Sequence, residues 1–150
     1  SRFGFSDVLT MFLALNASVE LYKGGVVPLA EYAQRPYDRD ILVRVLVPKE
    51  NARFVYQSVR NSQTDFPVLT CAAAKLADGS IRAAIGARPG KAVLYTAAPE
   101  AGETAEEFAA RFAAEVKADI KTESNLRGGA EYRRHLAGVL TKRAVCRLEG

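Results

Sequence analysis

Histidine, cysteine and tryptophan are scarce in this sequence, and their scarcity excludes most self-contained active sites. The chain has one histidine, two cysteines and no tryptophan. His135 has no second metal-ligating residue at a useful spacing, which excludes a zinc or iron–sulfur site and indicates a surface residue of the last helix. A glycine-rich phosphate loop and a G-x-S-x-G nucleophile elbow are also missing. Any reaction involving this chain must therefore be carried by a cofactor or a partner chain.

Long apolar runs are missing as well. No run reaches the roughly 18 residues of a transmembrane helix. The apolar segment at residues 8–15 lacks the basic region and cleavage site of a signal peptide. Cys71 and Cys146 have no metal-ligating neighbours, so both are predicted to be buried, reduced thiols. We therefore expect a cytoplasmic protein, and a start at Ser1 rather than Met hints at a fragment.

The overall composition is that of an ordinary globular protein. The 150 residues are 49% hydrophobic and 25% charged, with a formal net charge of +4. This length allows one domain, or a small domain with part of a second. A mild positive charge is more often scattered surface charge than a nucleic-acid interface.

Three short strands form the centre of the predicted fold. Residues 54–59, 67–76 and 81–86 are rich in apolar residues, and Asp78-Gly79 between the last two is a strong β-hairpin signal. We expect a three-stranded antiparallel sheet with one apolar face. Such a sheet is stable when helices cover that face.

Two amphipathic helices at the end of the chain are the expected cover. The first follows a candidate short strand at residues 92–95 and begins near Thr104, which has capping-box spacing with Glu107. The second begins near Gly129. Its predicted buried face comprises Tyr132, Leu136, Val139 and Leu140, with Arg134, Thr141 and Lys142 turned away. The predicted fold class is α+β.

Residues 1–50 show no obvious complete core of their own. A helix is expected after Ser6, which can cap it, and Asp7 lies in the first turn beside free backbone amides. Its body, residues 8–15, is apolar nearly all round and should be buried on most sides. Strands are predicted at 17–22 and 41–47, one helical turn at 29–32, and a boundary at 48–51.

Several motifs in fixed order resemble one family. Residues 127–144 closely resemble the ending of the FAD-binding (medium) subunits of molybdenum hydroxylases of the carbon monoxide and xanthine dehydrogenase type. Ser6-Asp7 before an apolar helix is similar to the family's S-D-L-x-P-x-L-x-A-L segment, and residues 40–42 (D-I-L) to its E-I-L segment. The Asp78-Gly79 hairpin and residues 84–89 (A-I-G-A-R-P) are similar to its C-terminal domain. Each motif is weak alone, but their order and spacing are specific.

The resemblance covers only about the C-terminal half of such a subunit. It implies that residues 1–50 are the end of the second FAD-binding subdomain, and that residues 51–150 are a CO dehydrogenase flavoprotein C-terminal-like domain. The family's glycine-rich pyrophosphate-binding segment and its T-x-G-G-N-I stretch have no counterpart in this sequence. We therefore expect the chain alone to hold FAD weakly and to be inactive.

Three cofactor contacts follow from the resemblance, and no catalytic or metal-binding residue. Asp7 would meet the ribityl or ring region, Leu42 would pack on the ring system, and Gln57 would replace the family's flavin-proximal lysine without its charge. The residues themselves leave structural alternatives open. Asp7 is also typical of an acid in a first helical turn, Leu42 of a core strand residue, and Gln57 of a solvated strand residue. The loop at 60–65 would gate nicotinamide access to the flavin, or be an inert surface loop.

The implied enzyme holds FAD in the complete subunit, with the molybdenum cofactor and iron–sulfur clusters on partner subunits. NAD or another acceptor would take the electrons. The alternative function is a non-catalytic assembly or nucleic-acid-binding module that uses the basic last helix. Its six basic groups are Arg133, Arg134, His135, Lys142, Arg143 and Arg147. They are not interleaved with the aromatic residues that single-strand binding uses.

Overall fold

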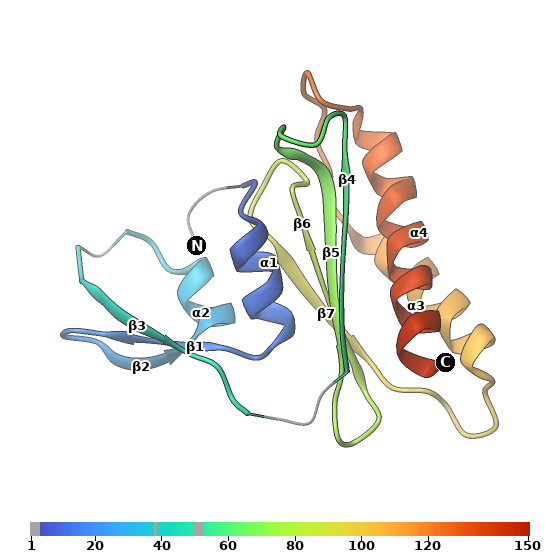
Figure 1. Ribbon diagram of the computed structural model, residues 1–150, viewed down its shortest axis with the longest axis horizontal. Coiled ribbons are helices and arrows are strands. Elements are labelled where there is room, and N and C mark those ends of the chain that lie inside the picture. The colour runs from blue at the N-terminus through green and yellow to red at the C-terminus, as the bar shows by residue number, and fades with distance from the viewer. Residues whose placement is uncertain (1–3, 38, 50–52) are drawn as a thin grey trace.

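The computed structural model describes residues 4–37, 39–49 and 53–150, and these form two antiparallel sheets flanked by helices (Figure 1). In chain order the elements are α1 (Asp7–Ala14), β1 (Ser18–Leu21), β2 (Gly25–Pro28), α2 (Leu29–Gln34), β3 (Leu42–Leu46), β4 (Arg53–Arg60), β5 (Pro67–Lys75), β6 (Ile81–Gly86), β7 (Val93–Ala97), α3 (Ala105–Asp119) and α4 (Ala130–Glu149). The predicted α+β class is confirmed.

The larger sheet has the strand order β4-β5-β6-β7, with every pair antiparallel. The three predicted strands are present, and the candidate strand at 92–95 is the fourth, β7. In the hairpin between β5 and β6, Gly79 has φ = 84°, which glycine adopts without strain. All but the last residue of β5 are buried. This sheet is therefore covered on both faces, and not on one as the sequence suggested.

Helices α3 and α4 cover one face of this sheet (Figure 1). The predicted capping box at the start of α3 is confirmed: the Thr104 hydroxyl accepts from the Glu107 amide, and the Glu107 carboxylate accepts from the Thr104 amide. Phe108 and Phe112 follow on the buried side of α3, with parallel rings 6.0 Å apart, and they pack into the core with β5 and β6.

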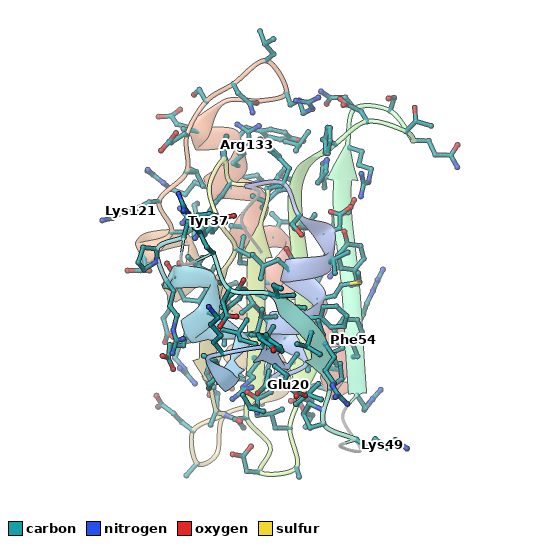
Figure 2. The ribbon with its side chains drawn as sticks, turned by 90° about the vertical axis from the view of Figure 1, so that its left-hand side faces the viewer. Glu20, Tyr37, Lys49, Phe54, Lys121 and Arg133 are labelled. Atoms are coloured by element: carbon teal, nitrogen blue, oxygen red, sulfur yellow. The ribbon has the colours of Figure 1, made fainter. Side chains whose placement is uncertain are left out.

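The predicted buried face of α4 is partly wrong. Tyr132 is half-exposed, while Thr141 is fully buried. Val139 lines an outer groove between α3 and α4. Arg133, predicted only as one of six basic groups and labelled in Figure 2, is fully buried and reaches from α4 to the beginning of β5. These residues depart from the prediction because hydrophobic periodicity counts apolar side chains only, whereas α4 also buries polar ones.

The guanidinium of Arg133 joins α4, β5 and the α3–α4 connection. Its Nε donates to the carbonyl of Val68 at 2.9 Å. Its Nη atoms donate to the carbonyls of Glu123 and Gly128, at 2.7 and 2.5 Å, and to Asn125 Oδ1 at 2.5 Å. Burial lowers the pKa of this guanidinium from its ordinary value. The hydrogen bonds from Arg133 to these uncharged oxygens hold the backbone of residues 123–128 in its conformation.

Helix α1 lies on the opposite face of the larger sheet (Figure 1). The contact is close because Gly86 has no side chain: a Cβ there would lie 2.1 Å from Thr10 Oγ1 and 2.6 Å from Thr70 Oγ1. The two threonine hydroxyls lie 3.2 Å apart and are both buried. As predicted, Ser6 caps α1, with its Oγ accepting from the Leu9 amide at 3.1 Å.

The smaller sheet has the order β2-β1-β3 and lies beyond α1 (Figure 1). It confirms the strands predicted at 17–22 and 41–47, and the predicted helical turn is α2. Strand β3 lies at an edge, and all five of its residues are exposed although four of them are apolar. The boundary predicted at 48–51 lies partly outside the described residues.

Within the described ranges, no helix is long and apolar enough to cross a membrane. The same ranges hold no group of three or more His, Cys, Asp or Glu residues that could bind a metal ion. Cys71 is buried as predicted, but Cys146 is exposed on α4. The prediction for Cys146 was wrong because this residue lies on the outer side of its helix.

Candidate functional site

Three adjoining hollows surround the beginning of α1. Their volumes are about 390, 350 and 100 Å³, and Ser6 lines all three. The first is apolar, with Gly4, Phe5 and Phe66. The second is polar and includes Asp7 and Arg60. The third lies toward the smaller sheet and is lined by apolar side chains, including Leu42.

A half-buried polar cluster of Asp7, Arg60 and Tyr56 lies at the polar hollow. Arg60 Nη2 donates to Asp7 Oδ2 at 2.5 Å, which raises the pKa of the guanidinium. Burial and the nearby Asp7 carboxylate raise the pKa of Tyr56 to about 12, so this phenol stays protonated. Asp7 Oδ1 and the Tyr56 hydroxyl oxygen are buried, and the phenol lies near the Asp7 carboxylate but outside ordinary hydrogen-bond geometry.

These two atoms form a complementary pair for a ligand. A carboxylate oxygen accepts hydrogen bonds, and a phenol can donate or accept one. Buried polar atoms without partners are uncommon in folded proteins, because each costs free energy when it is left unpaired. The phenol and the carboxylate can therefore pair with each other, or with a polar group that enters the hollow lined by Asp7 and displaces that contact.

Ion pairs hold the loop between β4 and β5 at this site. Besides Asp7, Arg60 contacts Ser58 Oγ at 2.9 Å and the Asp65 carbonyl at 2.7 Å. Arg127, from the α3–α4 connection, donates to Asp65 Oδ1 from Nε at 3.0 Å and Nη2 at 2.9 Å. This guanidinium lowers the pKa of the Asp65 carboxyl. The loop is thus fastened to α1 on one side and to the α3–α4 connection on the other.

Two aromatic rings line the apolar hollow, and the same arginine lies over both of them. The rings of Phe5 and Phe66 lie 6.2 Å apart with an interplanar angle of 54°. The Arg127 guanidinium carbon lies 5.3 Å from the Phe66 ring centre and 5.9 Å from that of Phe5. Phe66 remains 59% exposed. The hollow therefore offers an accessible aromatic surface beside a cation.

The structure brings two of the three predicted cofactor residues to this region. Asp7 lines the polar hollow, and Leu42 lines the small apolar hollow together with Val8 and Val45. Leu42 is 41% exposed on edge strand β3, so it is not a plain core residue. Contact of either residue with a flavin stays a prediction.

Gln57 is not brought to the same place. Its neighbours Val55 and Val59 pack into the core beneath α3 and α4, and its Nε2 donates to the Leu140 carbonyl of α4 at 3.2 Å. Tyr56, the residue that precedes Gln57 in β4, packs instead into the core on the α1 side. Gln57 therefore lies on the sheet face opposite Asp7, and its predicted cofactor contact stays untested.

Sequence reasoning missed Tyr56, Arg60 and Arg127 as members of one site. The alternation of β4 could have indicated the first two, since Val55 and Val59 mark the core side and Tyr56 and Arg60 fall on the other. Arg127 is separated from Asp65 by 62 positions, and no local pattern in the sequence links them. Its presence at the site depends on the tertiary fold.

The cluster has the chemistry of a binding site. The described part of the chain offers no nucleophile with an adjacent base at these hollows, and its histidine, His135, lines a different groove. Burial raises the pKa of the Cys71 thiol to about 12, which makes it unreactive. What the site offers is a fixed carboxylate, a phenol, arginines and apolar surface.

Comparisons with known proteins agree on the fold. Residues 54–148 match the family model described as CO dehydrogenase flavoprotein C-terminal domain. The carbon monoxide dehydrogenase of Hydrogenophaga pseudoflava matches 97% of this chain with a TM-score of 0.80 and 22% identity. Reconstituted CO dehydrogenase from Oligotropha carboxidovorans matches 98%, with 0.79 and 20%. Quinoline 2-oxidoreductase from Pseudomonas putida 86 matches 99%, with 0.78 and 18%.

This chain corresponds to only part of each matched protein. The chain spans 57% of the length of each of these three matched chains. No curated protein sequence matches it significantly. At identities of 18–22% the solved structures establish the fold alone. The assignment to a sequence family depends on the family-model match at residues 54–148.

Proposed function

The chain belongs to the CO dehydrogenase flavoprotein C-terminal domain family, and we propose that it forms the C-terminal half of the FAD-binding subunit of a molybdenum hydroxylase. Residues 1–50 would be the end of the second FAD-binding subdomain and residues 51–150 the C-terminal domain. When bound, FAD supplies redox chemistry that connects iron–sulfur clusters to NAD or another acceptor. The iron–sulfur clusters and the molybdenum cofactor would belong to partner subunits.

The observation that carries this proposal is the cluster of Asp7, Arg60 and Tyr56 at the polar hollow, which Asp7 and Arg60 line. A flavin ring system bears both carbonyl oxygens and an imide N–H, so it can accept from a phenol and donate to a carboxylate. The Tyr56 hydroxyl and Asp7 Oδ1 supply these two groups, and a bound ring would take the place of their contact with each other. We propose that they orient the polar end of the ring, with Arg60 holding the Asp7 carboxylate in place.

The apolar part of the ring would lie toward the smaller sheet. Leu42, Val8 and Val45 line the adjacent hollow, and all three are substantially exposed in this chain. Planar apolar surface against these side chains would remove them from water, at about 25 cal/mol per Å² buried. We propose that Leu42 contacts the ring system here.

Gln57 has a different part in this proposal. Its amide is bound to the Leu140 carbonyl on the α4 side of the sheet, so we propose that it positions β4 rather than touching the ring. Through β4 it would affect where Tyr56 and Arg60 lie. The sequence supplies no glycine-rich cradle for a pyrophosphate, so the chain alone would hold the ring part of FAD and little else.

Titration of flavins tests the proposal. Lumiflavin, which has the ring alone, and FAD are each titrated with the chain, and binding is followed by quenching of flavin fluorescence. We expect both to bind with dissociation constants within about threefold of each other, near 0.1–1 mM (about −4 to −5.5 kcal/mol), because only ring contacts are available. Lumiflavin that causes no quenching at millimolar chain would refute a ring site here.

A matched pair of variants locates the site. Tyr56→Phe removes the hydroxyl beside the Asp7 carboxylate and keeps the ring, so the chain should stay folded while lumiflavin binding weakens about fivefold. Tyr132→Phe removes a hydroxyl from a half-exposed residue of α4 and should leave binding unchanged. Equal effects of the two substitutions would contradict the assignment of Tyr56.

A further inference from the structure

A shallow groove runs between α3 and α4 on the side of the molecule away from α1. Its volume is about 200 Å³, and it is lined by Ala113, Ala114, Lys117, His135, Gly138, Val139 and Lys142. The floor is made of small residues and one valine. Gly138 allows the helices to approach closely: a Cβ there would lie 3.4 Å from both the Ala113 carbonyl oxygen and Lys117 Cβ. The groove thus offers small apolar side chains between two helices.

Basic side chains line the rim of this groove. Lys117, His135 and Lys142 line it, and none forms an ion pair with an acidic residue in the described part of the chain. Glu131 lies one turn before His135 on α4 but does not line the groove. The groove therefore has lysines at its rim and no internal counter-charge among the residues that line it.

The other basic residue of α3, Arg111, forms ion pairs within the chain. Arg111 donates to Glu103 and to Glu115 on its own side of the helix, with N–O distances of 2.8–2.9 Å. Glu103, which precedes α3, and Glu115 of α3 are thus bound to this arginine, and neither lines the groove. On the same helix, one cation is internally neutralised and the other, Lys117, is left for an external partner.

We propose that this groove binds an acidic amphipathic helix of another protein chain. Glutamates of that helix would face Lys117 and Lys142, and small apolar residues would lie on Ala113, Gly138 and Val139. Three helices packed side by side bury apolar stripes in this manner, and opposite charges across the rim set orientation and partner choice. A nucleic-acid strand is a poorer fit, because the groove lining contains no aromatic residue on which bases could stack.

The exposed thiol of Cys146 allows a direct test. Cys146 follows Lys142 by one turn on α4, and Cys71 is buried and unreactive. A maleimide–benzophenone reagent therefore labels the folded chain next to the groove. The labelled full chain is irradiated in an extract of its native cells, and cross-linked peptides are sequenced by mass spectrometry. We expect one protein, cross-linked through a segment with helical periodicity and several Asp or Glu residues.

Charge reversal decides whether the contact depends on the groove. Lys117→Glu with Lys142→Glu should lower the cross-link yield about tenfold. As a control, Lys49→Glu with Arg147→Glu reverses two exposed charges outside the groove lining. This variant should change the cross-link yield less than twofold. Replacing the captured glutamates by lysine should restore the cross-link with the reversed variant.

Three results would overturn the proposal. These are a cross-linked segment without an excess of acidic residues, an unchanged yield after reversal at Lys117 and Lys142, and cross-links to nucleic acid alone. None of these results depends on flavin binding, so the test is independent of the proposed function.

Discussion

Replacement of Gly86 by alanine tests how closely α1 lies on the larger sheet. The new methyl group would lie 2.1 Å from Thr10 Oγ1 and 2.6 Å from Thr70 Oγ1, far inside van der Waals contact. Both hydroxyls are buried, so neither can turn into water. Because Asp7 is in the first turn of this helix, any shift of α1 also moves the candidate site.

The expected loss of stability is about 2–4 kcal/mol. Overpacking of a close contact costs about 1–3 kcal/mol. Separation of the two hydroxyls, which are 3.2 Å apart, costs about 1 kcal/mol more. With a urea m-value of about 2 kcal/mol/M for a chain of this size, the unfolding midpoint should fall by about 1–2 M.

Urea unfolding followed by circular dichroism measures this shift. Gly129→Ser is the control, since a side chain there meets nothing within 4 Å, and a serine cap should be neutral or add a few tenths of a kcal/mol. Thr10→Ala in the Gly86→Ala background removes the atom that clashes most and should recover about half of the loss. A midpoint within 0.25 M of the unsubstituted chain (about 0.5 kcal/mol), or no coupling between positions 10 and 86, would refute the packing described for α1.

Three further predictions concern other parts of the chain. Arg133→Met should destabilise the chain by about 3 kcal/mol in urea unfolding, because it leaves buried carbonyls without a donor; a loss below 1 kcal/mol would contradict the bonding described. Ellman's reagent should modify one thiol, Cys146, in the folded chain and Cys71 only after unfolding; two fast-reacting thiols would contradict the burial of Cys71. Arg111 lowers the pKa of Glu103 from 4.5 to about 2, so this carboxylate stabilises the fold above pH 4.5, and that contribution is lost as pH falls from 4.5 to 2. Glu103→Gln should therefore reduce the decrease in the free energy of unfolding between pH 4.5 and pH 2. An unchanged decrease would contradict the ion pair between Glu103 and Arg111.

Local patterns predicted the elements of the larger sheet and of α3 well. The Asp78-Gly79 turn, the alternating apolar runs and the Thr104–Glu107 spacing each act over a few residues, so their physical effect can be read from short segments. The residues of the site are different. Asp7 and Arg60 are 53 positions apart and Asp65 and Arg127 are 62 apart, and these pairs meet only through the fold.

Gln57 shows where a family likeness and strand geometry lead to different conclusions. The likeness assigns it a cofactor contact, but Val55 and Val59 on either side are apolar with a period of two. That period places Gln57 on the core side with them, where it binds Leu140. Thr141 illustrates the same limit on α4, since this polar residue is fully buried against the sheet beside Cys71.

Strand β3 has a consequence for handling the protein. Among the described residues it pairs with β1 alone, so its outer edge presents backbone amides and carbonyls beside exposed leucine and valine side chains. Such an edge can add a strand from any extended polypeptide, including another copy of itself. Concentrated samples should therefore self-associate through Leu42–Leu46, and a lysine at Val43 or Val45 should keep them dispersed.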